Sequence, residues 1–217
     1  MSTFTESIPR SVVVDTSARI TRKTIDRVLT LFGVVLTLAL VVAGALLMWG
    51  ASFSADYVDD ELSSQNITFP PAEALAEEGR DDLVKYGGEV VNTGPEAEAY
   101  ASFINGHLEG IADGATYAEL GTPEREAKAA LDAAKESGAS EAEIAKLEGE
   151  YNSISGQRNT LFKGETLRGL LLSAYAWATV GQIAFYAAIG AFVAAAAMAV
   201  LTVFGFRHMR KLEHQEA

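Results

Sequence analysis

The chain has 217 residues, a net charge of −12, a 49% share of hydrophobic residues and no cysteine. The lack of cysteine excludes a disulfide framework, a thiolate metal site, a cysteine nucleophile and an acylated-cysteine anchor. The mean hydropathy of +0.14 lies between that of a soluble enzyme and that of a polytopic transporter. Such a value is expected when about a quarter of a chain spans a membrane.

A first membrane span is predicted at residues 28–50, after a cytoplasmic segment at 1–27 that carries five cations and three anions. A hydrocarbon core of roughly 30 Å needs about 20 helical residues at 1.5 Å each, so this apolar run can cross it. A cleaved signal peptide is the alternative, but its apolar part is usually about 7–15 residues long. We therefore expect an uncleaved helix, closed by Trp49 as an anchor at the outer membrane–water interface.

Residues 51–178 are predicted to form an extracytoplasmic α-helical domain. Within it, residues 51–169 hold nine cations and 24 anions, so they cannot sit in lipid. The same acidity would repel the phosphates of a nucleic acid, which excludes such a partner. No segment shows convincing strand alternation. The predicted fold class is all-α, with two transmembrane helices and an extracytoplasmic helical bundle inserted between them.

Local signals divide this region into helices. The segment 54–64 is predicted to extend the first span as a polar helix, and 66–71 to be extended because residues before proline avoid the α conformation. Proline, glycine and capping residues mark the remaining boundaries. Helix starts are expected at Pro71, Pro95, Thr122 and Ser140, and stops at Gly87–Gly88 and Gly138.

The helix expected after Pro95 carries the only histidine of the outer region, His107. Its apolar positions have the i, i+3, i+4, i+7 spacing of one buried face. They are Tyr100, Phe103, Ile104, His107, Leu108 and Ile111. A metal ligand one turn away would stand at 103 or 111, which are Phe and Ile, so a core histidine is the preferred interpretation. His107 and Tyr100 form the candidate ligand site; no catalytic residue, cofactor or metal ligand is predicted.

A second span is predicted at residues 179–206, with Trp177 as the anchor at its outer boundary. Its small residues recur every three or four positions, a spacing that lets helices approach closely in lipid. The predicted partner-packing row comprises Ala187, Gly190, Ala191, Ala194, Ala195 and Ala199. Two interpretations stay open, since this row can pack on the first span or dock on a larger membrane partner. The segment from Gly164 to Phe206 has no proline, so one continuous helix is expected there.

The charges at the span ends predict the topology. The tail at 207–217 carries three cations and two anions, and lysine or arginine beside a span favours the cytoplasmic side. Both termini are therefore expected in the cytoplasm, in a two-pass protein of the plasma membrane. Neither predicted span contains Asp, Glu, Lys or Arg, which argues against a proton or ion path through them.

Three stretches carry a resemblance to a known group of proteins. They are Phe69-Pro70-Pro71-Ala72-Glu73, Tyr100-Ala101-Ser102-Phe103-Ile104-Asn105-Gly106-His107 and Gly164-Glu165-Thr166-Leu167-Arg168-Gly169-Leu170-Leu171-Leu172. Over nearly its whole length the chain resembles a family of two-span actinobacterial membrane proteins of unassigned function, often labelled aromatic ring-opening dioxygenase subunits. That label would require iron ligands, and one external histidine leaves no facial triad. Small membrane proteins of similar architecture accompany the cytochrome bcc–aa3 respiratory supercomplex, so the resemblance implies an accessory role by analogy.

These observations predict a non-enzymatic integral membrane protein. Its expected role is an accessory or assembly subunit, or a scaffold, of a larger envelope or respiratory membrane complex. The alternative is a membrane-anchored extracytoplasmic sensor or ligand-binding domain. The expected partners are the lipid bilayer and a membrane protein or a second copy of the chain.

Overall fold

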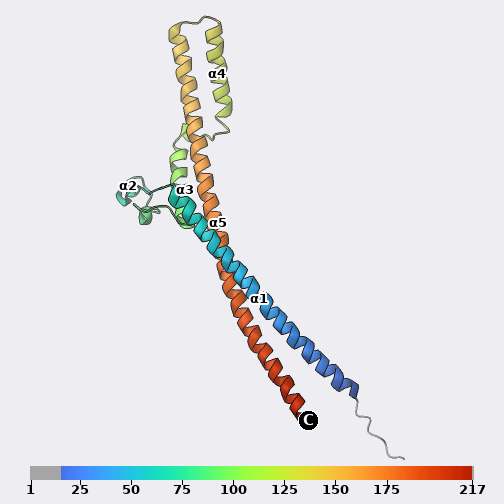
Figure 1. Ribbon diagram of the computed structural model, residues 1–217. Coiled ribbons are helices and arrows are strands. Elements are labelled where there is room, and N and C mark those ends of the chain that lie inside the picture. The colour runs from blue at the N-terminus through green and yellow to red at the C-terminus, as the bar shows by residue number, and fades with distance from the viewer. Residues whose placement is uncertain (1–15, 217) are drawn as a thin grey trace, which may run out of the picture. The chain divides into compact units, whose positions relative to one another are not determined.

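The computed structural model describes the backbone of residues 16–216 and the side chains of residues 24–211 (Figure 1). Helices dominate this part of the chain, and its only β pairing is an isolated antiparallel bridge between Thr68 and Val90. The predicted all-α class is therefore confirmed for the described residues. The elements are α1 (Thr16–Ser64), α2 (Ala72–Glu77), the 3-10 turn η1 (Val84–Tyr86), α3 (Gly94–Glu109), the 3-10 turn η2 (Ala112–Gly114), α4 (Gly121–Glu136) and α5 (Glu141–Glu216).

The chain divides into two compact units. The first, here termed the terminal unit, comprises Met1–Met48 and Phe185–Ala217, and the second, the central unit, comprises Trp49–Ala184. Both α1 and α5 contribute to each unit. The expected bundle is consequently not a separate insertion between two self-contained spans, because the ends of α1 and α5 are themselves major helices of the central unit.

In the terminal unit, α1 and α5 approach closely at glycines. A Cβ added to Gly33 would lie 2.6 Å from Thr202 Oγ1, and one added to Gly44 would lie 2.9 Å from the Phe192 ring. The hydroxyl of Thr30 is buried in this contact and donates to its own helix, at the carbonyl of Asp26 (2.8 Å). Close approach at small residues, with polar groups satisfied locally, is how helices pack in lipid.

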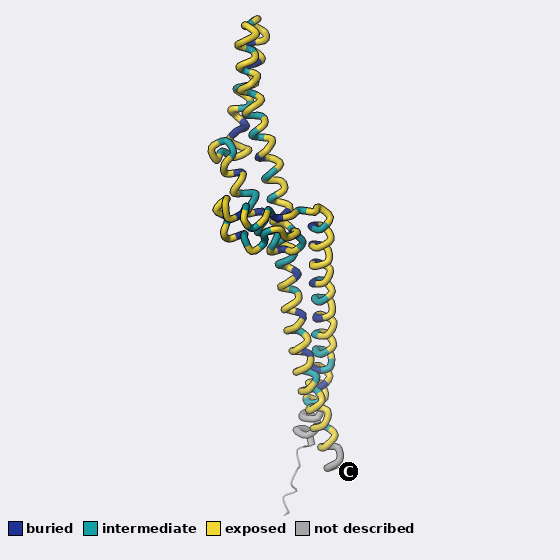
Figure 2. Tube along the Cα trace, turned by 90° about the vertical axis from the view of Figure 1, so that its left-hand side faces the viewer, coloured by how far each residue is buried: buried dark blue, intermediate teal, exposed yellow. Residues whose placement is uncertain are grey.

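Two described helices are long and apolar enough to cross a membrane, Thr24–Ser64 and Glu141–Lys211, with mean hydropathies of 2.7 and 2.3 in their most apolar stretches. Only 11% of each stretch is buried, whereas the core helix of a soluble protein is mostly buried. Figure 2 shows the exposed positions running along both helices. The α5 helix is unbroken over 76 residues, which confirms the expected continuity beyond Gly164.

The core of the central unit lies where α1, α3 and α5 meet. Its buried residues are Val58, Leu62, Phe69, Val91, Ala97, Ala101 and Leu171. The α3 helix passes so close to α5 that a Cβ on Gly94 would overlap the Cβ of Ala178. Alanines therefore fill this part of the core, since larger side chains would force the helices apart.

The segment between α1 and α3 is irregular but well anchored. Residues 66–71 are non-helical as predicted, and the backbone N–H groups of Phe69 and Val91 donate to Glu89 and Ile67 (2.9 and 2.8 Å). Arg80 attaches the segment to α3, because its guanidinium donates to both the carbonyl and the hydroxyl of Ser102 (3.1 and 2.9 Å).

An antiparallel hairpin of α4 and the first part of α5 forms the remainder of the central unit (Figure 1). Gly138 ends α4 with a φ of +70°, and the Ser140 hydroxyl accepts from the backbone N–H of Glu143 (3.3 Å) at the start of α5. The predicted stop and start are thus confirmed. A second core cluster of Leu108, Leu120 and Leu161 joins this hairpin to α3.

Candidate functional site

The predicted partner-packing row on α5 is divided between two faces of the helix. Ala195 is buried, and Ala191 and Ala199 are half-buried, on the side that faces α1 within the terminal unit. The remaining members are exposed: Ala187, Gly190 and Ala194. A Cβ added to Gly190 would meet no atom within 4 Å. The chain's own α1 therefore covers half of the predicted row and leaves a second half, here termed the open row, uncovered.

The two predicted anchors, Trp49 and Trp177, are both exposed but lie at different levels of the central unit. Ser54 of α1 fixes the register, because its hydroxyl donates to the carbonyl of Trp177 (2.6 Å) and its Cβ lies 2.8 Å from a Cβ built on Gly181. Along α1, Trp49 lies five residues before Ser54, and so on the side of this contact that faces away from Trp177. At 1.5 Å per residue the two indoles are roughly 10 Å apart along the helices.

An exposed aromatic column connects these two levels along α1. Trp49 stacks on Phe53, with ring centroids 5.9 Å apart, and Phe53 stacks on Tyr57 at 6.1 Å. All three rings are at least 48% exposed. The column follows from spacing, because residues four apart lie on the same face of a helix. It presents a continuous aromatic surface about 12 Å long.

His107 lies on the surface, so the preferred core interpretation is wrong. Its side chain is 57% exposed, its Nε2 lies 3.8 Å from a carboxylate oxygen of Glu78, and its Nδ1 lies 3.1 Å from the carbonyl of Phe103. The buried face of α3 runs instead through Ala97, Ala101 and Leu108. The close passage of α3 over α5 selects this alanine face for the core and leaves His107 on the outer side of the helix.

Tyr100 does not form a joint pocket with His107. It is half-buried against the first core cluster, where its ring meets Phe69 edge-on at 5.1 Å, and burial raises the pKa of its phenol. The ring of Phe103 lies between the two predicted residues, 5.5 Å from Tyr100 and 4.5 Å from His107. This arrangement is an aromatic row along α3 in which Phe103 separates the two predicted residues.

A cleft that sequence reasoning missed lies between α4 and α5. It has a volume of about 450 Å³, and Arg158 of α5 is among the residues that line it. The Arg158 guanidinium stacks 4.2 Å above the Tyr117 ring, donates to the Tyr117 carbonyl (3.3 Å) and pairs with the carboxylate of Glu124. The hydrogen bonds from Ser155 and Arg158 lower the pKa of Glu124.

The walls of this cleft offer aromatic faces and neutral amides. The rings of Tyr117 and Phe162 lie 5.7 Å apart, and Asn152 and Asn159 are exposed on the same face of α5. The volume falls within the range of small-molecule pockets, about 300–1,000 Å³. Because Glu124 neutralises Arg158, the arrangement suits a neutral polar ligand. Only the three-dimensional register of α4 against α5 brings these residues together.

Among the described residues, no group of three or more histidines and carboxylates is placed to hold a metal ion. Comparisons of the chain with models of protein families, with curated proteins and with solved structures find no match.

Proposed function

We propose that the protein is a two-pass integral membrane protein in which the apolar parts of α1 and α5 cross the bilayer. Their length and hydropathy, together with the 11% burial of their most apolar stretches, support this proposal. A signal sequence near the N-terminus would have a similar apolar run. The residues of α1 that continue into the core of the central unit, such as Val58 and Leu62, favour retention of the helix.

The proposed orientation places both termini in the cytoplasm and the acidic central unit outside. Five cations before the first span and three after the second support it, because lysine and arginine close to span ends resist translocation. The unit between them translocates regardless of its charge, since long loops do so.

The proposed role is that of a non-enzymatic accessory subunit or scaffold within a larger envelope or respiratory membrane complex. The observation that carries it is the open row of Ala187, Gly190 and Ala194, which remains exposed after α1 has covered the other members of the predicted row. Small residues at this spacing let a second helix approach closely in lipid. The partner is a transmembrane helix of another protein or of a second copy of the chain.

Co-purification of the full chain in mild detergent tests this role. The double variant Gly190→Leu/Ala194→Leu is expected to lower the recovery of the partner about tenfold by overpacking the contact. Ala196→Leu is the matched control, because Ala196 is also exposed and two residues rotate a helix by roughly 200° away from Ala194. Recovery of the unaltered chain only as a monomer, or equal loss in the control, would contradict the role.

A second candidate function is the binding of a small ligand by the central unit. The cleft around Arg158 and Tyr117 favours it, whereas the exposed pair His107–Glu78 does not enclose a ligand. A thermal-shift screen of the full chain against neutral oligosaccharides and small amides tests this function. A rise in melting temperature that Phe162→Ala abolishes would support it, and no response to any compound would contradict it.

A further inference from the structure

A second cavity lies in the central unit, in a groove between the end of α1 and the adjoining part of α5. Its volume is about 280 Å³. Val58, Leu62 and Leu171 of the first core cluster contribute to its lining, and Tyr57 and Trp177 line it at the end nearest the membrane spans. The groove is smaller than most pockets for whole ligands, so it fits a slender apolar segment.

The α5 side of this groove belongs to an unusually long uncharged stretch. Residues 169–206 contain no Asp, Glu, Lys or Arg, and as helix they extend about 57 Å. A bilayer needs only roughly 40–45 Å, headgroups included. The part of this uncharged helix that exceeds the bilayer thickness includes Leu170, which lines the groove and is 65% exposed. An apolar surface of this kind, continuous with a membrane span, is covered by lipid or by protein.

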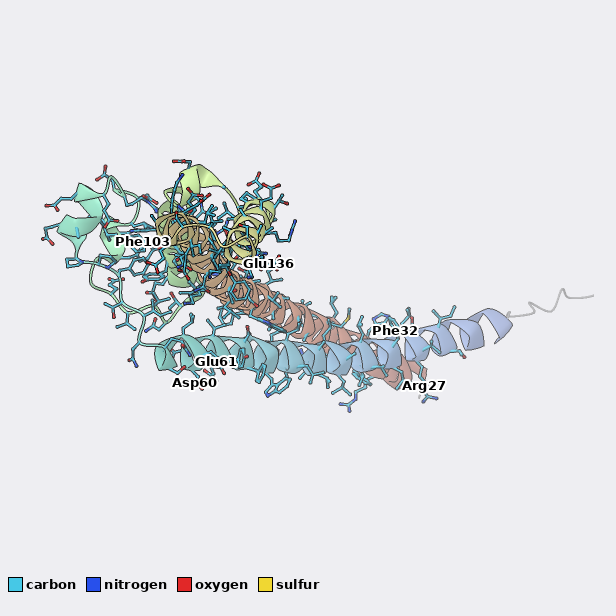
Figure 3. The ribbon with its side chains drawn as sticks, turned by 90° about the horizontal axis from the view of Figure 1, so that it is seen from above. Arg27, Phe32, Asp60, Glu61, Phe103 and Glu136 are labelled. Atoms are coloured by element: carbon cyan, nitrogen blue, oxygen red, sulfur yellow. The ribbon has the colours of Figure 1, made fainter. Side chains whose placement is uncertain are left out.

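The α1 side of the groove supplies negative charge. Glu61 lines the groove, and Asp56, Asp59 and Asp60 lie within the preceding turn and a half of the same helix. Figure 3 marks Asp60 and Glu61 near the end of α1. No lysine or arginine lines the groove, and none of the ion pairs among the described residues involves the Glu61 carboxylate. Its occupant should therefore combine an apolar chain with a cationic group.

We propose that the groove binds a membrane lipid whose head group carries a primary ammonium, of the phosphatidylethanolamine class. The acyl chain enters the groove from the end lined by Tyr57 and Trp177 and passes Val58, and the ammonium group donates to the carboxylate of Glu61. Phosphatidylglycerol lacks the cation and is repelled by the acidic turns. Phosphatidylcholine carries a quaternary nitrogen that has no N–H to donate. The proposal rests on the proposed insertion of α1 and α5 into a bilayer.

Fluorescence quenching by lipids with brominated acyl chains tests the groove, because Trp49 and Trp177 are the only tryptophans. The full chain with Trp49→Phe retains Trp177 as the single reporter at the groove. In detergent, half-quenching by brominated phosphatidylethanolamine is expected at a concentration about threefold to fivefold lower than by brominated phosphatidylglycerol, the size of effect an exposed ion pair gives.

Two variants in the same background locate the binding. Glu61→Gln is expected to remove the preference between the two lipids, whereas Glu73→Gln, an exposed control on α2, should keep it. Ala174→Phe, which fills the groove, is expected to weaken quenching by both lipids. Equal quenching by the two lipids in the parent protein, or a preference unchanged by Glu61→Gln, would overturn the proposal.

The reciprocal variant Trp177→Phe separates this result from the question of membrane insertion. It leaves Trp49, which vesicles of either brominated lipid should quench if the spans insert. If Trp49 is quenched but Trp177 is quenched equally by the two lipids, the proposed lipid binding in the groove is overturned and membrane insertion is not. No quenching of Trp49 in vesicles would overturn the insertion on which the groove depends.

Discussion

Arg158 connects three parts of the central unit through one guanidinium group. It stacks on Tyr117, pairs with Glu124 of α4 and projects from α5. Lysine cannot replace it, because a point charge neither stacks on a ring nor donates in a planar fork. The Arg158 and Glu124 side chains are only 26% and 18% exposed, and their pairing fixes the position of α4 on α5.

The pH dependence of unfolding should report this pair. Hydrogen bonds from Ser155 and Arg158 hold the pKa of Glu124 below its ordinary value of 4.5. A group with a lowered pKa in the folded state stabilises the fold above its unfolded pKa, and the contribution is lost as the pH falls through the folded pKa. Glu124→Gln should therefore show a smaller fall in melting temperature than the unaltered chain between about pH 6 and about pH 3, followed by circular dichroism.

The matched control is Glu126→Gln, an exposed carboxylate on the same helix, which should keep the full fall. Part of the fall will survive in Glu124→Gln, because Asp82 and Glu119 also have lowered pKa values through hydrogen bonds from Arg80 and Thr116. If the melting temperatures of the unaltered chain and of Glu124→Gln fall equally with pH, the stabilising pairing of Glu124 with Arg158 is contradicted.

Two glycines should respond in opposite directions to the same substitution. Gly94→Ala forces the start of α3 against Ala178 and is expected to lower the free energy of unfolding by about 1–3 kcal/mol. Gly149 lies in open space on the first part of α5, so Gly149→Ala should raise it by about 0.5–1 kcal/mol through helix propensity alone. Denaturant titration of the full chain in detergent measures both. A neutral Gly94→Ala would contradict the close packing of α3 on α5.

At the scale of the elements, the contact of α1 with α5 in the terminal unit can be tested by a disulfide. The Cβ of Thr30 lies 3.9 Å from a Cβ built on Gly205, within the range of about 3.5–4.5 Å that disulfides require. Thr30→Cys/Gly205→Cys should thus form an intramolecular bond under mild oxidation in membranes, seen as a shift in gel mobility. The chain has no other cysteine to interfere.

Leu31→Cys/Gly205→Cys is the control, because Leu31 is exposed and lies about 100° further round α1. It should stay reduced. Formation of a dimer in place of the internal bond would show that this face of α1 meets a second copy and not α5.

The helices whose limits the sequence predicted best are those with a local chemical signal. Gly138 and Ser140 marked the turn of the hairpin, since a positive φ and a hydroxyl cap act within a few residues. The helix expected from Pro71 to Gly87 ends instead at Glu77. Gly79 takes a φ of +72° there, and Arg80 then turns toward α3, a long-range attachment that no local pattern encodes.

The candidate sites depended even more on long-range contacts. Glu78 lies opposite His107, although Glu109 and Asp113 are nearer to it along the chain, and Glu109 accepts instead from Asn105 (2.7 Å). The cleft at Arg158 needs Glu124, which is 34 residues away in the chain. The small-residue row was visible in the sequence, but which half of it α1 covers depends on the rotation of α5 about its axis.

At the scale of the whole molecule, the distribution of charge predicts which parts lie on each side of a membrane. Residues 51–169 hold an excess of 15 negative charges, and the two terminal segments, 1–27 and 207–217, together hold an excess of three positive charges. The proposed topology puts these two groups on opposite sides. A single label on each side can test it, because the natural chain contains no cysteine.

The substitutions for this test are Ser140→Cys, at the exposed turn between α4 and α5, and Ser2→Cys, which lies outside the described residues. In intact cells a membrane-impermeant maleimide should label Ser140→Cys and leave Ser2→Cys unreacted until the cells are opened. The reason is that only the central unit faces outward when both positive ends stay in the cytoplasm. Labelling of Ser2→Cys alone in intact cells would invert the topology, and labelling of both would indicate a single crossing. The same labelled Ser140→Cys, recovered at full length, would also exclude cleavage of the first apolar segment.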